Sequence, residues 1–213
     1  YTDGVPEAKN KDNKMFKIDA CLDALNKDPD ADVETLLHNV SESVSDFVKD
    51  AEQFDDLTML GFEYIGQDSN NNNMETSYNI YTEANLDNIN VITDFICNHI
   101  EEIGCDAKIS NKIRLAAEEI ITNIVSYAYS DTDKDNNVYV TLKISDNNQR
   151  ITIIFKDNGV PFDPLAKKDP DITLKAKDRK IGGLGIFLTK KIMNTVNYEY
   201  KNNQNILTIT KLL

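Results

Sequence analysis

The segment that decides the fold reads Leu115-Ala-Ala-Glu-Glu-Ile-Ile-Thr-Asn-Ile-Val-Ser-Tyr-Ala-Tyr129. Its apolar residues recur at helical spacing, so we expect one helix from about Ser110, as its N-cap, to Tyr129. A spacing of four puts Glu119 and Asn123 on one face, one turn apart. An Asn oxygen suits a hard cation such as Mg²⁺, and a neighbouring Glu can act as a general base. Such pairs are also common on exposed helices, so the pair alone does not decide the function.

A second feature, Asp157-Asn-Gly-Val-Pro-Phe-Asp-Pro164, directly follows an expected strand, Ile151–Lys156. An Asp at a strand end can accept a hydrogen bond from an exocyclic amine, which is one way to bind adenine. Gly159 lets the backbone approach a flat ring. Asn-Gly also occurs in ordinary turns, but the two prolines rule out a hairpin that continues as a strand.

The third feature is Gly182-Gly-Leu-Gly185, at the start of an expected helix over Gly183–Thr195. Glycines before a helix allow backbone amides to meet an anion at the positive end of the helix dipole. The run lacks the Lys-Ser/Thr of a P-loop and does not follow a strand as a dinucleotide fingerprint would. Those two nucleotide-binding motifs are therefore disfavoured.

The order of the remaining elements predicts the architecture. We expect the C-terminal part to add strands over Tyr78–Thr82, Val138–Ser145, Tyr198–Tyr200 and Ile206–Leu212, and a helix over Asn85–Ile103 that Gly104 terminates. A long polar stretch, Asp163–Lys180, separates the second central strand from the last helix. Antiparallel strands with helices collected on one side indicate the α+β class and a two-layer α/β sandwich.

The N-terminal part is predicted to be mostly helical. We expect a strand end at Tyr1–Val5, helices over Lys17–Lys27 and Val33–Ala51, and a strand over Leu57–Ile65. The asparagine-rich run from Gly66 to Thr76 cannot anchor a core and is predicted to be a linker. The predicted division is therefore residues 1–65, a linker over 66–76, and a domain over 77–213.

Composition narrows the class of partner. Lys and Arg number 23 against 36 Asp and Glu, a net charge of −13, which argues against nucleic acid. The three cysteines form no CxxC pair, so neither a zinc site nor a disulfide framework is expected, and a reducing cytoplasm is the simplest setting. No apolar run approaches the ~18 residues of a membrane span. Because the chain begins with Tyr1, we expect a piece of a longer protein.

Together, and in this order, the three features resemble the N, G1 and G2 boxes of GHKL (Bergerat-fold) ATPases. The resemblance covers about Ser77–Leu213, and LAAEEIITNIVSYAY, DNGVPFDP and GGLGIFLTKKIMN are most similar to the anti-sigma-factor serine kinases. It implies ATP and Mg²⁺ as cofactors. The roles it implies are Mg²⁺ binding by Asn123, general-base catalysis by Glu119, adenine binding by Asp157 and Gly159, and phosphate binding by Gly183, Gly185 and either Lys180 or Arg179. The polar stretch Asp163–Lys180 would be the ATP lid, and Tyr127 stands where this branch often has His.

The resemblance implies a serine protein kinase that acts on a STAS-type antagonist and binds a sigma factor, and homodimers are frequent in this branch. The alternative is a non-catalytic module that sequesters a sigma factor or regulates an attached enzyme. A histidine kinase is disfavoured because no phospho-acceptor helix pair precedes the domain.

Two N-terminal motifs resemble another family. Tyr1-Thr-Asp-Gly-Val-Pro-Glu-Ala8 and Gln53-Phe-Asp-Asp-Leu-Thr-Met-Leu60 are similar to the last third of PPM-type serine phosphatases of the sporulation and stress-response kind. The resemblance makes Asp3 and Asp55 ligands of a Mn²⁺ or Mg²⁺ pair in a complete domain, whereas Asp55-Asp56 can equally be a solvated loop. Because a two-metal site needs further carboxylates, we expect no phosphatase activity here. We expect either a helical appendage or strand edges that pair with another copy, and a longer parent could be a phosphatase that the ATPase-like domain regulates.

Overall fold

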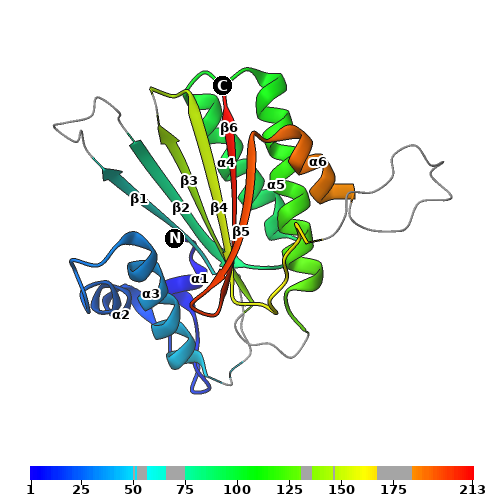
Figure 1. Ribbon diagram of the computed structural model, residues 1–213. Helices are drawn as coiled ribbons and strands as arrows, with labels where there is room; N and C mark the ends of the chain where they lie inside the picture. The colour runs from blue at the N-terminus through cyan, green and yellow to red at the C-terminus, as the bar shows by residue number, and fades with distance from the viewer. Residues whose placement is uncertain (50, 52–56, 66–74, 131–135, 146, 167–183) are drawn as a thin grey trace.

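The computed structural model describes residues 1–49, 51, 57–65, 75–130, 136–145, 147–166 and 184–213. One sheet of six antiparallel strands, in the order β1-β2-β3-β4-β6-β5, forms the centre of the protein (Figure 1). The strands are β1 (Thr58–Ile65), β2 (Glu75–Glu83), β3 (Asn137–Ser145), β4 (Arg150–Asp157), β5 (Thr195–Lys201) and β6 (Gln204–Leu212). The α+β class expected from the sequence is confirmed.

Strand β4 shows why the sheet forms where it does. Its residues alternate between the two faces, and Ile151, Ile153 and Phe155 are buried in the main core. Asp157 is the next residue in this row and is also buried. The apolar row therefore ends in a carboxylate at the edge of the core, and this places a polar group where apolar walls surround it.

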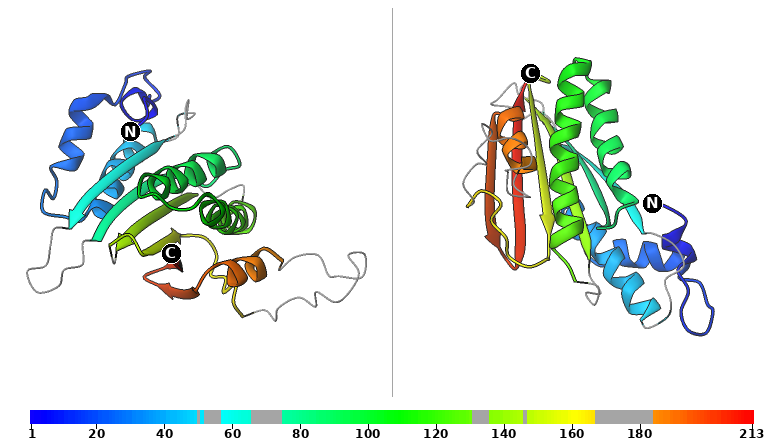
Figure 2. Two further views of the ribbon diagram at one scale, coloured as in Figure 1. Left: turned by 90° about the horizontal axis from the view of Figure 1, so that it is seen from above. Right: turned by 90° about the vertical axis from the view of Figure 1, so that its right-hand side faces the viewer.

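Helices α4 (Asn88–Glu102), α5 (Ala107–Tyr127) and α6 (Leu184–Ile192) cover one face of the sheet (Figure 2). Their inward stripes are rich in isoleucine, and Ala116 and Ala117 on α5 are fully buried. Such small residues let a long helix lie close to its neighbours, which agrees with the extensive packing of α5 on both α4 and α6.

The boundaries of α4 and α5 have identifiable causes. Gly104 adopts φ +79°, and its N–H donates to the carbonyl of Glu101 while the N–H of Cys105 donates to Ile100, which closes α4 as a Schellman motif. The predicted stop at Gly104 is confirmed. Ser110, however, is not the N-cap of α5: Asp106 accepts from the N–H of Lys108 at 2.8 Å, and Ser110 lies buried within the helix. The first amides of a helix have no partner within the helix, and the Asp106 carboxylate accepts a hydrogen bond from one of them. The helix therefore begins one turn earlier than predicted.

The opposite face carries a third layer, formed by the N-terminal helices that the sequence predicted but did not place against the sheet. Helices α1 (Gly4–Glu7), α2 (Lys17–Leu25) and α3 (Val33–Val48) form a second core against the sheet, with Met59 of β1 and Tyr139 of β3 (Figure 2). The predicted strand end at Tyr1–Val5 is wrong, because Val5 is buried in this second core within a helical turn. The two-layer arrangement describes the helices and strands after Glu75, and the N-terminal helices add to it.

Strand β1 joins this N-terminal part to the main sheet. It pairs with β2 from Thr58↔Thr82 to Ile65↔Glu75. The N–H of Thr2 donates to the carbonyl of Thr58 at 2.9 Å, which ties the start of the chain to the start of the strand. The β2 side of β1 is therefore paired within the chain and not with another copy. Most of the expected linker, residues 66–74, lies outside the described residues, and β2 begins at Glu75.

No helix among the described residues has both the length and the apolar character needed to cross a membrane.

The contact between β1 and α3 yields a prediction about stability. A Cβ added to Gly61 would lie 2.2 Å from Cγ1 of Val33, a stiff side chain that cannot turn away. We expect Gly61→Ala to lower the free energy of unfolding by about 1–3 kcal/mol through overpacking. Urea denaturation measures this loss, and adding Val33→Ala should recover part of it. Wild-type stability in Gly61→Ala would contradict the packing of α3 on β1.

Candidate functional site

A pocket opens on the α4–α5–α6 face, where α5 ends and β4 leaves the core. Its polar lining residues are Asn123, Asp157 and Asn205, together with the partly polar Tyr127 and Tyr198. The remaining walls are apolar: Ile120, Ile124, Ala128, Val160, Phe162, Pro164, Ile186 and Leu207. Apolar walls around a few fixed polar groups are typical of a site for a small molecule or cofactor.

Asp157 is the most constrained polar residue in the pocket. Its Oδ1 accepts from Nδ2 of Asn205 at 2.8 Å and from the N–H of Gly159 at 3.0 Å. Burial raises the pKa of the Asp157 carboxyl, and these two hydrogen bonds oppose that rise. Within the described residues no hydrogen bond reaches Oδ2, so this oxygen is left for a donor on a ligand.

Asn205 is a site residue that the sequence analysis missed. Its Nδ2 also donates to the carbonyls of Gly159 (3.3 Å) and Val160 (3.2 Å), and its Oδ1 accepts from the N–H of Phe162 (3.2 Å) and the hydroxyl of Tyr198 (2.7 Å). One amide side chain thus holds both Asp157 and the loop that follows it. Only the pairing of Asp157 with Asn205 between β4 and β6 identifies Asn205 as a site residue, and the sequence alone does not reveal this pairing.

Gly159 is buried against the C-terminal end of α5. A Cβ at this position would lie 2.4 Å from the carbonyl oxygen of Ala128, and the N–H of Val160 donates to that same oxygen at 2.9 Å. Glycine is therefore needed here because the loop contacts the helix backbone, in addition to the predicted approach to a ligand ring.

Glu119 and Asn123 lie one turn apart on α5, as predicted, and Asn123 lines the pocket. The Glu119 carboxylate reaches the start of α6, where a Cβ on Gly185 would lie 2.0 Å from its Oε2. A larger residue at position 185 would clash with the carboxylate where it now lies, so glycine allows Glu119 to lie against the start of α6. Gly183 and Lys180, predicted phosphate ligands, lie outside the described residues, as does Arg179.

The oxygen donors of the pocket fit a Mg²⁺ ion that is bound mainly by nucleotide phosphates and water. A Mg²⁺ ion on nucleotide phosphates keeps several waters and takes only one or two protein oxygens. Asn123 offers one such oxygen within the pocket. Separately, the described residues contain no group of three His, Cys, Asp or Glu side chains suited to holding a metal by themselves.

Of the two predicted metal ligands in the N-terminal motifs, Asp3 and Asp55, only Asp3 is described. It is exposed at the start of α1. The N–H of Thr2 donates to the carbonyl of Thr58, and the N–H of Thr58 donates to the hydroxyl of Thr2. The first motif therefore lies beside the end of the second. Asp55 lies outside the described residues.

The buried carboxyl of Asp157 yields a prediction about pH. Because its folded-state pKa is raised above the ordinary 3.8, its neutral form favours folding, and that contribution is lost as the pH rises through the raised pKa. Asp157→Asn keeps an oxygen for Asn205 and Gly159 and removes the charge. We expect its Tm to exceed that of the wild type at pH 7, and the difference to shrink toward pH 4.

Thermal melts between pH 4 and 8 check this, with the exposed Asp19→Asn as the matched control. A lower Tm for Asp157→Asn at pH 7 would show that the ionised carboxylate stabilises the fold.

Two families and several curated proteins are similar in sequence to this chain. Residues 1–64 match stage II sporulation protein E. Among curated proteins, the chain is 26% identical to the serine/threonine-protein kinase BtrW of Bordetella bronchiseptica over 104 residues, 49% of this chain and 71% of that protein. It is 28% identical to the serine-protein kinase RsbW of Listeria monocytogenes over 99 residues, 45% of this chain and 61% of the relative. With RsbW of Staphylococcus aureus the identity is 30% over 105 residues, 47% of this chain and 64% of the relative.

These alignments span about half of the present chain and less than three quarters of each relative. The match that covers most of the sequence is to the histidine kinase-like ATPase domain, over residues 82–211. It contains every residue named above as lining the pocket. The chain therefore belongs to the histidine kinase-like ATPase domain family.

Proposed function

We propose that this protein binds Mg–ATP in the pocket beside α5 and transfers the γ-phosphate to a serine of a partner protein. The observation that carries the proposal is the Asp157 carboxylate, which has one oxygen held by Asn205 and Gly159 and the other left for an amine. Relatives named as serine-protein kinases support the choice of acceptor.

Each residue has a distinct task in this proposal. The apolar walls enclose the adenine, and Oδ2 of Asp157 accepts a hydrogen bond from its amino group. Asn123 would hold Mg²⁺, which would supply charge neutralisation at the phosphates. Gly185, at the start of α6, would meet those phosphates together with Gly183 and Lys180, which lie outside the described residues.

Glu119 supplies the acid–base chemistry. Its carboxylate lies beside Gly185, at the start of α6, where the phosphates would be held. It accepts the proton of the serine hydroxyl as the serine oxygen attacks the γ-phosphorus, and the bond to ADP breaks. The products are a phosphoserine, ADP and a protonated Glu119.

The wider setting is part of the same proposal. The partner would be a STAS-type antagonist, and the domain would also bind a sigma factor in the cytoplasm, either as a monomer or as a homodimer. Residues 1–65 would be the end of a PPM-type phosphatase in a longer parent, 66–76 a linker and 77–213 the kinase-like domain. Asp3 and Asp55 would belong to the metal pair of that phosphatase.

One observation favours the alternative of a non-catalytic, nucleotide-dependent regulator. Strand β1 of the N-terminal part is continuous with the ATPase sheet, so binding at one part can act on the other without phosphate transfer. Phosphorylation of a serine-bearing partner separates the two functions.

The first test concerns nucleotide binding. In Asp157→Asn an amide N–H₂ replaces the free oxygen and faces the amino group of adenine, so two donors oppose each other. We expect ATP affinity to fall about 100-fold or more, because one hydrogen bond is lost and a donor is left unsatisfied. Isothermal titration calorimetry with and without Mg²⁺ measures it, with Asp19→Asn as the control. Affinity equal to that of the wild type would place the adenine elsewhere.

The second test concerns catalysis. We expect Glu119→Gln to slow phosphate transfer by about 10²–10⁴-fold, since the amide cannot take the proton, while ATP affinity stays within about twofold of the wild type. The neighbouring exposed Glu118→Gln is the matched control and should keep both properties. The assay follows radiolabelled phosphate from ATP onto STAS-type proteins. Full transfer by Glu119→Gln would exclude it as the general base.

A further inference from the structure

A polar groove lies on the face of the sheet opposite the nucleotide pocket, between α3 and strands β2–β4. Its volume is about 470 Å³, and its walls include Glu34 and His38 of α3 with Tyr139 and Lys156 of the sheet. Asp157 and Asn158 also line it, and Asp157 lines the nucleotide pocket as well, so the two sites share one residue of β4.

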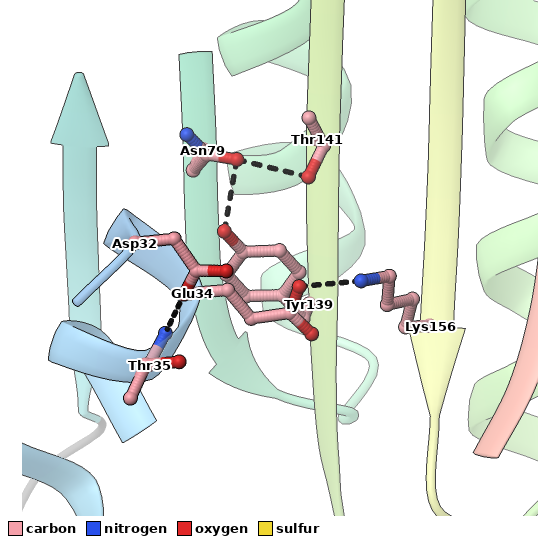
Figure 3. A network of polar contacts seen from close by, with 7 residues as sticks. All are labelled: Asp32, Glu34, Thr35, Asn79, Tyr139, Thr141 and Lys156. Atoms are coloured by element: carbon pink, nitrogen blue, oxygen red, sulfur yellow. Dashed lines mark hydrogen bonds and ion pairs between the residues drawn. The ribbon is translucent and has the colours of Figure 1, made fainter. Parts of the chain in front are cut away.

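The two sites meet through neighbouring residues of β4. Lys156 and Asp157 point to opposite faces because side chains alternate along a strand. Lys156 pairs with Glu34 in the first turn of α3, and both side chains are partly buried, with 21% and 33% of their surface exposed (Figure 3). The ion pair therefore joins the last residue before Asp157 to the N-terminal helical layer.

Both partners of this ion pair are held in place. On the helix side, Asp32 accepts from the N–H of Thr35 at 2.8 Å and fixes the start of α3 (Figure 3). On the sheet side, Nζ of Lys156 lies 5.6 Å from the centre of the Tyr139 ring. Burial raises the pKa of the Tyr139 hydroxyl well above its usual value, so it stays protonated and donates to Oδ1 of Asn79 at 2.9 Å. An ion pair between anchored side chains can transmit a displacement of α3 to β4.

We propose that Glu34 and Lys156 are positioning residues for the nucleotide site, through which the docking of α3 sets the affinity for ATP. Lys156 holds the end of β4 from behind and so orients Asp157 and the loop after it. The inference rests on the proposed binding of ATP at Asp157. It assigns a regulatory role to the N-terminal helical layer: whatever displaces α3 weakens ATP binding, and by linkage ATP strengthens the docking of α3.

Calorimetry of ATP–Mg²⁺ binding to Glu34→Gln, Lys156→Gln and the double variant tests this. We expect each single variant to bind about five- to tenfold more weakly than the wild type, within the usual range of coupling between sites. The double variant should be no worse than either single one, since both remove the same contact.

The control is a second Lys–Glu pair on the same sheet. Nζ of Lys143 lies 3.0 Å from Oε1 of Glu75, and 33% and 37% of the two side chains are exposed. Lys143 is on β3, five residues after Val138, the residue of β3 that pairs with Asp157. Glu75→Gln and Lys143→Gln therefore remove an equivalent charge pair at a distance from the pocket, and we expect ATP affinity within twofold of the wild type.

Hydrogen exchange supplies a readout that a purely structural role would not move. ATP should slow amide exchange in α3, Val33–Val48, of the wild type, and should do so much less in Glu34→Gln. If the wild type binds ATP but Glu34→Gln and Lys156→Gln match the control pair, the coupling is wrong and the proposed function stands. If the wild type binds no ATP, the proposed function fails and the inference fails with it.

Discussion

A single buried hydrogen bond, from Asn205 to Asp157, holds together the parts of the site that come from distant segments. It crosses from β6 to β4, at the end of the row of isoleucine and phenylalanine side chains that forms the core. A carboxylate at that depth is costly unless it is paired, and Asn205 offsets this cost while also holding the following loop. The loop then packs on the end of α5, so the positions of sheet, loop and helix depend on one amide group.

Much of this arrangement follows from local pattern. The isoleucine stripes of α4 and α5 have a helical period, Gly104 has the conformation that a helix end requires, and the row Ile151, Ile153, Phe155 alternates as a half-buried strand does. Glu119 and Asn123 were placed correctly on one helix face because a spacing of four residues is independent of the rest of the fold. The roles assigned to them remain predictions.

What the sequence could not supply is contact between distant segments. Asn205 stands among other asparagines, and only its register with Asp157 distinguishes it. Ser110 is a good capping residue by type, but Asp106 precedes it and takes the cap. Val5 could be read as part of a strand because the core that buries it is built by Phe16, Cys21 and α3, all later in the chain. In each case tertiary packing overrode a local preference.

The pairing of β1 with β2 has a consequence for how this protein can be divided. A fragment that began at Glu75 would keep every element of the nucleotide pocket but would leave the backbone donors and acceptors of β2 that face β1 without partners. It would also uncover Tyr81 and Tyr139 on the face that α3 protects. A bare, regular strand of this length is a template for intermolecular sheet growth. The N-terminal segment thus covers one edge and part of one face of the ATPase sheet, and separating the two parts would expose a surface that favours aggregation.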